Sequence, residues 1–339
     1  MSSFIPPSLS RRNLIVALFC GASMLAGGPA VSQVCQRSAE NGWTVNPPFR
    51  GDKARTQLSG AACNETLSRC IAANDEKVYA QSFSVSGSTI VPDSSIDLIP
   101  GDDEPDAEGA AYAPGSFYVT GSHGNSRRKN KPNDASYIVV RINAASGAVD
   151  GRSVKWRNAI FKSDKLANYA GKALKDGGPD QAGGVNVEGI AVWKDRMYLG
   201  FRGPSVSGNA YALSAPLKAV FDDPKVELDA KDHAIALGDK TGIRDLAAVD
   251  SGLLILTGPV NEPDEKDNKD VRVERLIFHW NPETGKLDRL AQLSPLPKDV
   301  KAETLVVLPD SDNSQFRVLL IFEGAPNGDP FECRFPRPK

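Results

Sequence analysis

Acidic and basic side chains recur at the starts of short apolar segments in this sequence. Glu108, Glu188 and Glu303 each open such a segment, and another opens with Arg244 and Asp245. Carboxylates that converge on one point repel one another unless positive charge compensates them. A divalent cation such as Ca²⁺, which takes several oxygen ligands, would compensate them, and so would arginine side chains. The repeated acids therefore predict either a metal site or a network of ion pairs.

The segments that follow these residues have the pattern of β-hairpins, which determines where the charges meet. In a hairpin, the start of the first strand lies beside the end of the second strand. Glu188 is therefore expected beside Arg202, and Glu108 is expected beside His123. If the first strand of every hairpin lines a central channel, the polar starts form a ring at one mouth of that channel.

Two classes of function follow from such a ring. With a metal, it could activate water or polarise an oxygen of a small phosphate ester or lactone. The candidate metal ligands are Glu108, Glu188, Asp245 and Glu303, and the candidate catalytic residues are His123, Arg202 and Arg244. With arginine-paired acids, the ring would be a structural network, or a non-catalytic site for a small polar ligand or a protein partner. The sequence leaves open whether the protein is an enzyme.

Histidine is the natural general base near neutral pH, and the chain has only three histidines. His123 is the candidate because of its place in the ring, whereas His279 lies in mid-strand and is expected to pack, and His233 follows a polar turn. The sequence has no G-x-S-x-G element, no Gly-Lys-Ser/Thr phosphate loop and no His/Cys zinc spacing. These absences argue against serine-esterase, nucleotide and zinc chemistry.

The hairpin pattern occurs five times, and this repetition predicts the fold. The copies span residues 59–76, 108–124, 188–204, 244–259 and 303–324, and the first copy is the weakest. Further strands are expected after each hairpin, so that each unit holds about four strands. Four-stranded units at this spacing are typical of a β-propeller. The composition, with 40% hydrophobic residues among 339, supplies a sizeable core for one such domain.

The predicted propeller is all-β and has five blades, with a sixth blade left open by residues 166–184. The fourth strand of the second unit is expected over Arg152–Trp156, followed by an insertion with helical spacing over Asp164–Leu174. Ser214 is expected to cap a short helix over Ala215–Phe221. The last unit lacks one strand, which the N-terminal lead-in could supply to close the ring.

The N-terminus has the features of an export signal, so residues 1–32 are expected to be a signal peptide. Arg11 and Arg12 precede an apolar run over Leu14–Leu25, followed by small residues. The pair of arginines fits a twin-arginine signal about as well as an ordinary secretory one. Residues 33–58 are then the lead-in, and residues 59–339 the propeller. Removal of residues 1–32 leaves 38 basic and 42 acidic residues, a net charge of about −4, which gives no support for nucleic-acid binding.

Four cysteines remain after this cleavage, an even number that predicts two disulfides in an exported protein. Cys63 and Cys70 lie on the two arms of the first hairpin, so a bridge between them is the simplest pairing. Cys35 and Cys333 would then tie the ends of the ring. Four cysteines allow three pairings, and free buried thiols are the remaining alternative.

Three motifs resemble a known family. They are Glu188–Ala191 followed by Gly200–Pro204, Thr120–His123 before them, and Ile243–Leu246 after them. In this order they resemble the bacterial domain of unknown function 3616, over Ser59 to about Gly324. The resemblance extends more distantly to the esterase-like activity of phytase family and to other propellers built on Glu-Gly strands. It implies the propeller fold and carries no activity over to this chain.

The expected partners and location follow from these features. The protein is expected to be a periplasmic or secreted monomer without a membrane span after the signal. A small polar or anionic ligand is expected at the mouth, with a divalent cation only if the acids bind metal. The basic loop over Arg127–Lys131 could contact an anionic substrate, or it could be an ordinary solvated loop.

Overall fold

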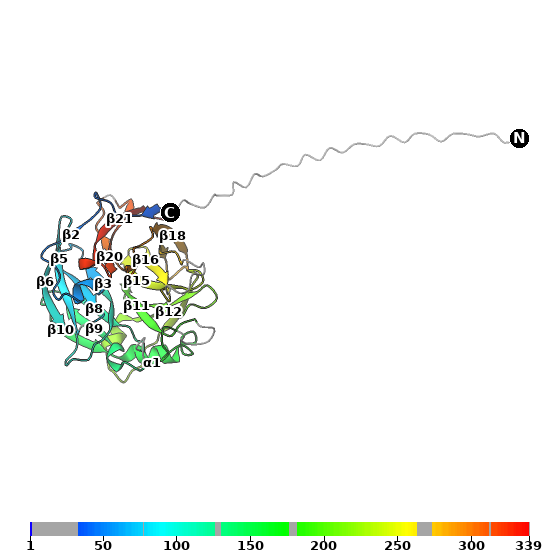
Figure 1. The fold of residues 1–339 in the computed structure, drawn as a ribbon. Helices are drawn as coiled ribbons and strands as arrows, with labels where there is room; N and C mark the ends of the chain where they lie inside the picture. The colour runs from blue at the N-terminus through cyan, green and yellow to red at the C-terminus, as the bar shows by residue number, and fades with distance from the viewer. Residues whose placement is uncertain are drawn as a thin grey trace. The chain divides into compact units, whose positions relative to one another are not determined.

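The computed structural model describes residues 1, 33–76, 78–125, 130–175, 182–262, 273–311 and 313–338. Most of the expected signal peptide and three of the basic residues in the 127–131 loop lie outside these ranges. Residues from Ser32 to Lys339 form one compact unit, in which five small sheets are arranged around a centre (Figure 1). The all-β, five-bladed propeller predicted from the repeats is thus confirmed.

Each blade is an antiparallel sheet whose strands follow one another in sequence from the centre outwards. Blade 1 contains β3 (Leu58–Cys63), β4 (Cys70–Asn74), β5 (Tyr79–Ser86) and β6 (Thr89–Asp97). Blade 2 contains β7 (Ala107–Ala113), β8 (Ser116–Gly121), β9 (Val139–Asn143) and β10 (Val149–Ser153). Blade 3 contains β11 (Asn186–Trp193), β12 (Arg196–Gly203), β13 (Ala210–Pro216) and β14 (Lys231–Ile235).

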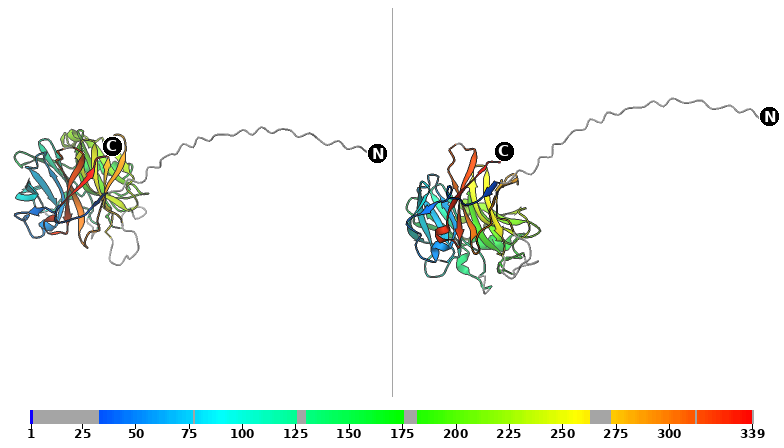
Figure 2. Two further views of the ribbon diagram at one scale, coloured as in Figure 1. Left: turned by 90° about the horizontal axis from the view of Figure 1, so that it is seen from above. Right: turned by 45° about the horizontal axis from the view of Figure 1, so that its top comes forward.

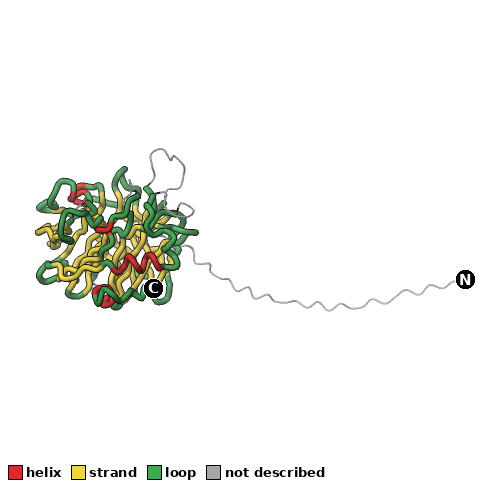
Figure 3. The backbone as a smooth tube through the Cα atoms, turned by 90° about the horizontal axis from the view of Figure 1, so that it is seen from below, coloured by secondary structure: helices red, strands yellow, loops and turns green. Residues whose placement is uncertain are grey.

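The last two blades are built from the C-terminal part of the chain. Blade 4 contains β15 (Thr241–Val249), β16 (Gly252–Pro259), β17 (Leu276–Trp280) and β18 (Leu287–Leu293). Blade 5 contains β19 (Lys301–Leu308), β20 (Gln315–Glu323) and β21 (Phe331–Pro336). The helices are short, namely α1 (Lys155–Lys162), α2 (Leu217–Phe221) and three 3₁₀ turns at Ala54–Thr56, Asp134–Ser136 and Pro326–Gly328 (Figure 3). No helix in the described part of the chain is long and apolar enough to cross a membrane.

The hydrophobic core is divided into five clusters, and each cluster fills the space between two neighbouring blades. Leu199 of blade 3 and Tyr118 of blade 2 share one cluster, for example, and Leu58 of blade 1 shares another with Leu319 of blade 5. The remaining three clusters join blades 1 and 2, blades 3 and 4, and blades 4 and 5. Because apolar area is buried between every pair of neighbours, the ring is closed by packing as well as by covalent bonds.

The lead-in closes the ring differently from the prediction. It was expected to complete blade 5, but its strand β1 (Gln33–Cys35) pairs with β18 of blade 4. It then makes a single bridge to blade 5, between Gly42 and Phe331, and its strand β2 (Thr44–Val45) pairs with β6 of blade 1. The polar residues between Cys35 and Gly42 favour a turn, so blade 5 remains a three-stranded sheet (Figure 2).

Both expected disulfides are present. Cys35 joins Cys333 across 298 residues, with a Cα–Cα distance of 5.6 Å. Cys63 joins Cys70 across the first hairpin, with a Cα–Cα distance of 4.0 Å. The longer bridge fixes the N-terminal strand of blade 4 to the last strand of blade 5. Closing so long a loop stabilises the fold by about 5 kcal/mol in the chain-entropy estimate.

The predicted insertion after blade 2 has a helix, but not at the predicted place. The fourth strand ends at Ser153, and the helix α1 begins at Lys155, because Trp156, Ala159 and Ile160 form an apolar face that packs between blades 2 and 3. The predicted helical spacing over 164–174 corresponds to turns. In the described part of 166–184 there is no strand, and no sixth blade forms.

The helix expected after Ser214 is also shorter than predicted. Ser214 lies within β13, where it pairs with Tyr198 and Lys231, and the helix α2 begins only at Leu217. Cross-strand pairing on both sides of β13 outweighs the capping preference of serine. The outer strand that pairs with β13, which is β14, has a charged and weakly apolar sequence and was not predicted.

Candidate functional site

A β-bulge occurs at the same place in all five inner strands, and it explains the repeated polar starts. In each inner hairpin the register skips one residue near the start of the first strand. The skipped residues are Ser59, Glu108, Glu188, Arg244 and Glu303. A bulge frees one residue from the strand ladder and redirects its side chain. All five side chains are buried, and we call this set the mouth ring.

The glycine that follows two of these residues is required by close contact between inner strands. A side chain at Gly60 would lie 2.7 Å from the backbone oxygen of Glu108. A side chain at Gly109 would lie 2.6 Å from the backbone oxygen of Glu188. Only glycine therefore allows neighbouring inner strands to approach so closely. The Glu-Gly pairs are thus a consequence of how the blades meet at the channel.

The arginines pair with the acids of the mouth ring. Arg202 Nη1 lies 2.8 Å from Glu188 Oε1, as the hairpin geometry predicted. Arg244 Nε lies 3.0 Å from Glu188 Oε2 and donates to Glu303 Oε2 at 2.8 Å. Arg244 Nη2 also pairs with Glu303 Oε1, and it lies 3.7 Å from Glu262 Oε1. Arg244 therefore links blades 3, 4 and 5 through shared carboxylates.

Asp245 lies beside the ring but acts within the backbone of two blades. Its Oδ1 accepts a hydrogen bond from Leu246 N at 2.8 Å, and its Oδ2 accepts one from Leu305 N at 2.7 Å. Burial raises the pKa of Asp245 well above its usual value, although these two hydrogen bonds lower it. The side chain joins the inner strands of blades 4 and 5.

The charge balance of the mouth is unusual because acids outnumber arginines. Burial raises the pKa of Glu303 to about 8, which outweighs the attraction of Arg244, and repulsion from Glu188 adds to it. Burial also opposes ionisation of Arg244, but Glu188, Glu303 and Glu262 together raise the pKa of its guanidinium. The arginines thus stay charged, and the excess negative charge is relieved by protonation of an acid.

His123 lies in the loop after β8, with a positive φ of 51° and a fully buried ring. Its backbone N–H donates to Ser136 O at 3.2 Å, and the ring packs edge-on against Tyr137. Burial lowers the pKa of His123 to about 3, although the Ile138 backbone raises it slightly. The imidazole is therefore neutral and weakly basic at neutral pH. Neither ring nitrogen makes a hydrogen bond within the described ranges.

The donor set of the ring does not fit a cation. Both carboxylate oxygens of Glu188 and of Glu303 lie against guanidinium groups, which leaves no oxygen of these acids facing a shared point without a positive neighbour. Asp245 is occupied by backbone amides. Among the described residues, no group of three or more His, Cys, Asp or Glu side chains is arranged to hold a metal. We therefore derive no chemistry through a metal at this ring.

Several neutral polar groups around the mouth have no protein partner among the described residues. They are Ser59 Oγ, the ring nitrogens of His123, Asn186 Oδ1, Ser205 Oγ and Thr304 Oγ1. A buried polar atom without a partner costs about 1–3 kcal/mol, so such atoms are normally met by water or a ligand. The sequence could not reveal these groups, since it shows the residue types but not which hydrogen bonds they make.

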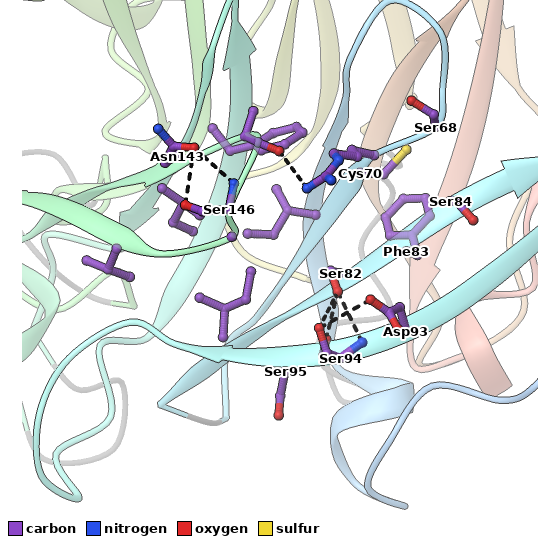
Figure 4. Close-up of a pocket in the computed structure, with 18 of the residues that line it drawn as sticks. Ser68, Cys70, Ser82, Phe83, Ser84, Asp93, Ser94, Ser95, Asn143 and Ser146 are labelled. Carbon is purple, nitrogen blue, oxygen red and sulfur yellow. Dashed lines mark hydrogen bonds between the residues drawn. The ribbon is translucent and has the colours of Figure 1, made fainter.

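A second hollow lies between the outer strands of blades 1 and 2 and has a volume of about 700 Å³ (Figure 4). Its hydroxyl groups bond to one another: Ser82 Oγ lies 2.8 Å from Ser94 Oγ, and Ser146 Oγ donates to Asn143 Oδ1 at 3.2 Å. Arg69 crosses between the blades and donates to Ala144 O at 3.0 Å. We call this hollow the rim groove. Its polar groups are largely satisfied within the protein, in contrast to those of the mouth.

Comparison with known proteins identifies the family. The chain matches the family described as "Protein of unknown function (DUF3616)" over residues 61–143 and 144–329, and it belongs to that family. This confirms the resemblance drawn from the sequence motifs. Among curated protein sequences, none matches the chain significantly.

Similar solved structures include three from unrelated settings. Hydrazine synthase from Kuenenia stuttgartiensis is 11% identical with a TM-score of 0.41, over 80% of this chain and 57% of that one, so this chain spans less than two thirds of it. A nidogen–laminin complex is 11% identical with a TM-score of 0.43, over 84% and 81%. A gluconolactonase from Xanthomonas campestris is 13% identical with a TM-score of 0.40, over 84% and 78%. Similarities this low carry no functional conclusion.

Proposed function

We propose that the protein is an exported propeller that binds a small, neutral, hydroxyl-rich ligand at the mouth ring, without a metal. The observation that carries this proposal is the group of buried neutral polar atoms around the mouth that lack protein partners, such as Ser59 Oγ and Thr304 Oγ1. The charged groups there are already paired with one another. The unused hydrogen-bonding capacity is therefore that of hydroxyl, amide and imidazole groups.

The chemistry of these groups favours a polyol or sugar over an anion. Hydroxyl groups donate and accept, and so they can match Asn186 Oδ1, a serine hydroxyl and a neutral imidazole at once. A carboxylate or phosphate ligand would add negative charge where acids already exceed arginines, at a cost in desolvation. The hydrolytic alternative at this ring needs a base, and a pKa of about 3 makes His123 a poor one.

Export is part of the proposal. Two disulfides lie in the described fold, and disulfides persist in oxidising compartments. The N-terminal residues 1–32 have the pattern of a cleaved signal. N-terminal sequencing of protein recovered outside the cytoplasm should begin near Gln33, and an uncleaved N-terminus would contradict this part of the proposal.

The binding proposal is tested by thermal unfolding against a panel of neutral sugars and polyols, with carboxylates and phosphate esters as the contrasting panel. A neutral polyol is expected to raise the melting temperature and to bind at one site by calorimetry. The double variant Ser59→Ala, Thr304→Val should bind it about tenfold more weakly, since it removes two hydrogen bonds of about 0.5–1.5 kcal/mol each.

The matched control is Ser84→Ala in the rim groove, which should leave the affinity unchanged. A chelator should not alter the melting temperature, because no metal is required. Binding that survives the Ser59/Thr304 variant, or a response only to phosphate esters in the presence of a divalent cation, would overturn the proposal.

A further inference from the structure

A serine, a histidine and an aspartate meet at the end of blade 4 that lies away from the mouth ring. Ser251 occupies the turn between β15 and β16, and its side chain is exposed. His279 lies near the end of β17, and Asp288 lies directly opposite it on β18. The strand pairing brings these two side chains to the same face of the sheet, because directly paired residues project together. We call the three residues the turn triad.

The distances within the turn triad have the order of a nucleophile, a base and an orienting acid. Ser251 Oγ lies 2.8 Å from His279 Nε2. His279 Nδ1 lies 3.9 Å from Asp288 Oδ2. The serine and the acid thus approach opposite nitrogens of one imidazole, which is the arrangement of hydrolytic triads on unrelated folds. Base–acid contacts in unliganded sites are commonly longer than they become during the reaction.

The environment suits proton transfer at neutral pH. The His279 ring is nearly buried and stacks on Phe316 at 6.0 Å, which fixes its plane. Burial lowers the pKa of His279, while Asp288 raises it, so the imidazole is neutral and can accept a proton. Lys286 Nζ lies 3.3 Å from Asp288 and places a positive charge at the same corner. A cation near a developing oxyanion lowers the energy of the transition state.

Blade 3 holds a second serine–histidine pair that shows what a structural pair looks like in this fold. Ser214 Oγ lies 2.9 Å from His233 Nε2, which is nearly the same distance. However, Ser214 is fully buried, and Arg196 also donates to its Oγ. The charged groups that act on His233 are the cations Lys231 and Arg196, so this pair has no acid to orient the base. The turn triad differs in both its acid and its exposed hydroxyl.

We propose that Ser251, His279 and Asp288 form a hydrolytic site for small carboxylic esters. Ser251 Oγ attacks the carbonyl carbon while His279 Nε2 takes the hydroxyl proton. The bond to the alcohol oxygen breaks, and the alcohol leaves with the proton from His279. Water then attacks the acyl group on Ser251, giving one proton to His279, which returns it to Ser251 as the carboxylic acid departs. Asp288 is a positioning residue that orients the imidazole.

The experiment is labelling of the purified mature protein with a fluorophosphonate, mapped by peptide mass spectrometry, alongside hydrolysis of an aryl acetate. Label is expected on Ser251, and Ser251→Ala should abolish both label and turnover. His279→Gln should slow labelling by about 100-fold or more, because general-base assistance is lost. Ser146→Ala is the matched control: this serine also lies in an exposed turn but has no histidine beside it, and its variant should label like the wild type.

The positioning residue gives a second, independent test. Asp288→Asn should slow labelling by about tenfold or more, and Asp288→Glu should restore part of the rate, which a merely structural role would not do. Asp288 is 28% exposed, so these variants are expected to fold even if the His279 variant does not. Thermal unfolding checks this. Absence of label on Ser251, or a labelling rate in folded Asp288→Asn equal to that of the wild type, would overturn the proposal.

Discussion

Blade 4 has polar side chains at both ends, and the two groups differ in how they are balanced. At the mouth, Arg244 is 1% exposed and is shared by Glu188 and Glu303. At the far end, Ser251 is exposed, and its partner His279 carries no charge at neutral pH. Charges that are buried and mutually paired hold blades together, whereas a neutral pair with an exposed hydroxyl leaves a group available for reaction. Burial and partner count separate these roles better than residue type does.

The largest effect is expected from removing the shared cation at the mouth. Arg244→Met should lower the free energy of unfolding by about 3–5 kcal/mol, because it leaves buried carboxylates without their partner. Urea unfolding measures this. Arg289→Met is the control on the same blade: that arginine is 41% exposed and pairs with Glu274 at 3.3 Å, so its loss should cost no more than about 1 kcal/mol. Equal costs for both variants would contradict the assigned difference between the two environments.

A smaller effect should appear in the pH dependence of stability. The pKa of Glu303 is raised to about 8 in the fold from an ordinary value of 4.5, so the folded state binds its proton more tightly than the unfolded state does. The free energy of unfolding should therefore fall as the pH rises through this window, by up to about 1.4 kcal/mol per pH unit from this group. Glu303→Gln cannot ionise and should give a flatter curve in urea unfolding across the same range. Asp245 contributes to both curves, and identical slopes would show that Glu303 is ionised throughout.

The smallest effect is expected at the two serine–histidine pairs. Ser251→Ala should change the free energy of unfolding by less than about 0.5 kcal/mol, because the side chain is exposed. Ser214→Ala should cost about 1–3 kcal/mol, because it leaves buried partners of the hydroxyl unsatisfied. Chemical denaturation of the two variants distinguishes them. A costly Ser251→Ala variant would indicate that the turn triad is a structural element like the blade 3 pair.

The blade pattern could be predicted from the sequence because it rests on local features. Apolar hairpins with a polar first residue recur, and Lys194 and Asp195 both adopt the positive φ angles of a tight hairpin turn. The pairing of Glu188 with Arg202 followed from the same geometry and is confirmed. The path of the lead-in across blades 4, 5 and 1 depends on contacts between residues nearly 300 positions apart, which no local pattern encodes.

The site was harder to predict than the fold. The sequence indicated that acids and arginines gather at one mouth, but not that Arg244 bridges two acids or that Asp245 binds backbone amides. His279 was expected only to pack, since nothing in the sequence links it to Ser251, 28 residues away. Such links arise from strand register, and a serine in a turn gives no signal when the G-x-S-x-G element is absent.

The most direct test of ligand binding at the mouth is a crystal structure of the protein with the polyol that most raises its melting temperature. We predict that the ligand hydroxyls lie within hydrogen-bonding distance of Ser59 Oγ, Thr304 Oγ1 and Asn186 Oδ1, with the Arg244–Glu303 pair intact. A ligand bound instead in the rim groove, with the mouth groups contacted only by protein, would contradict the account.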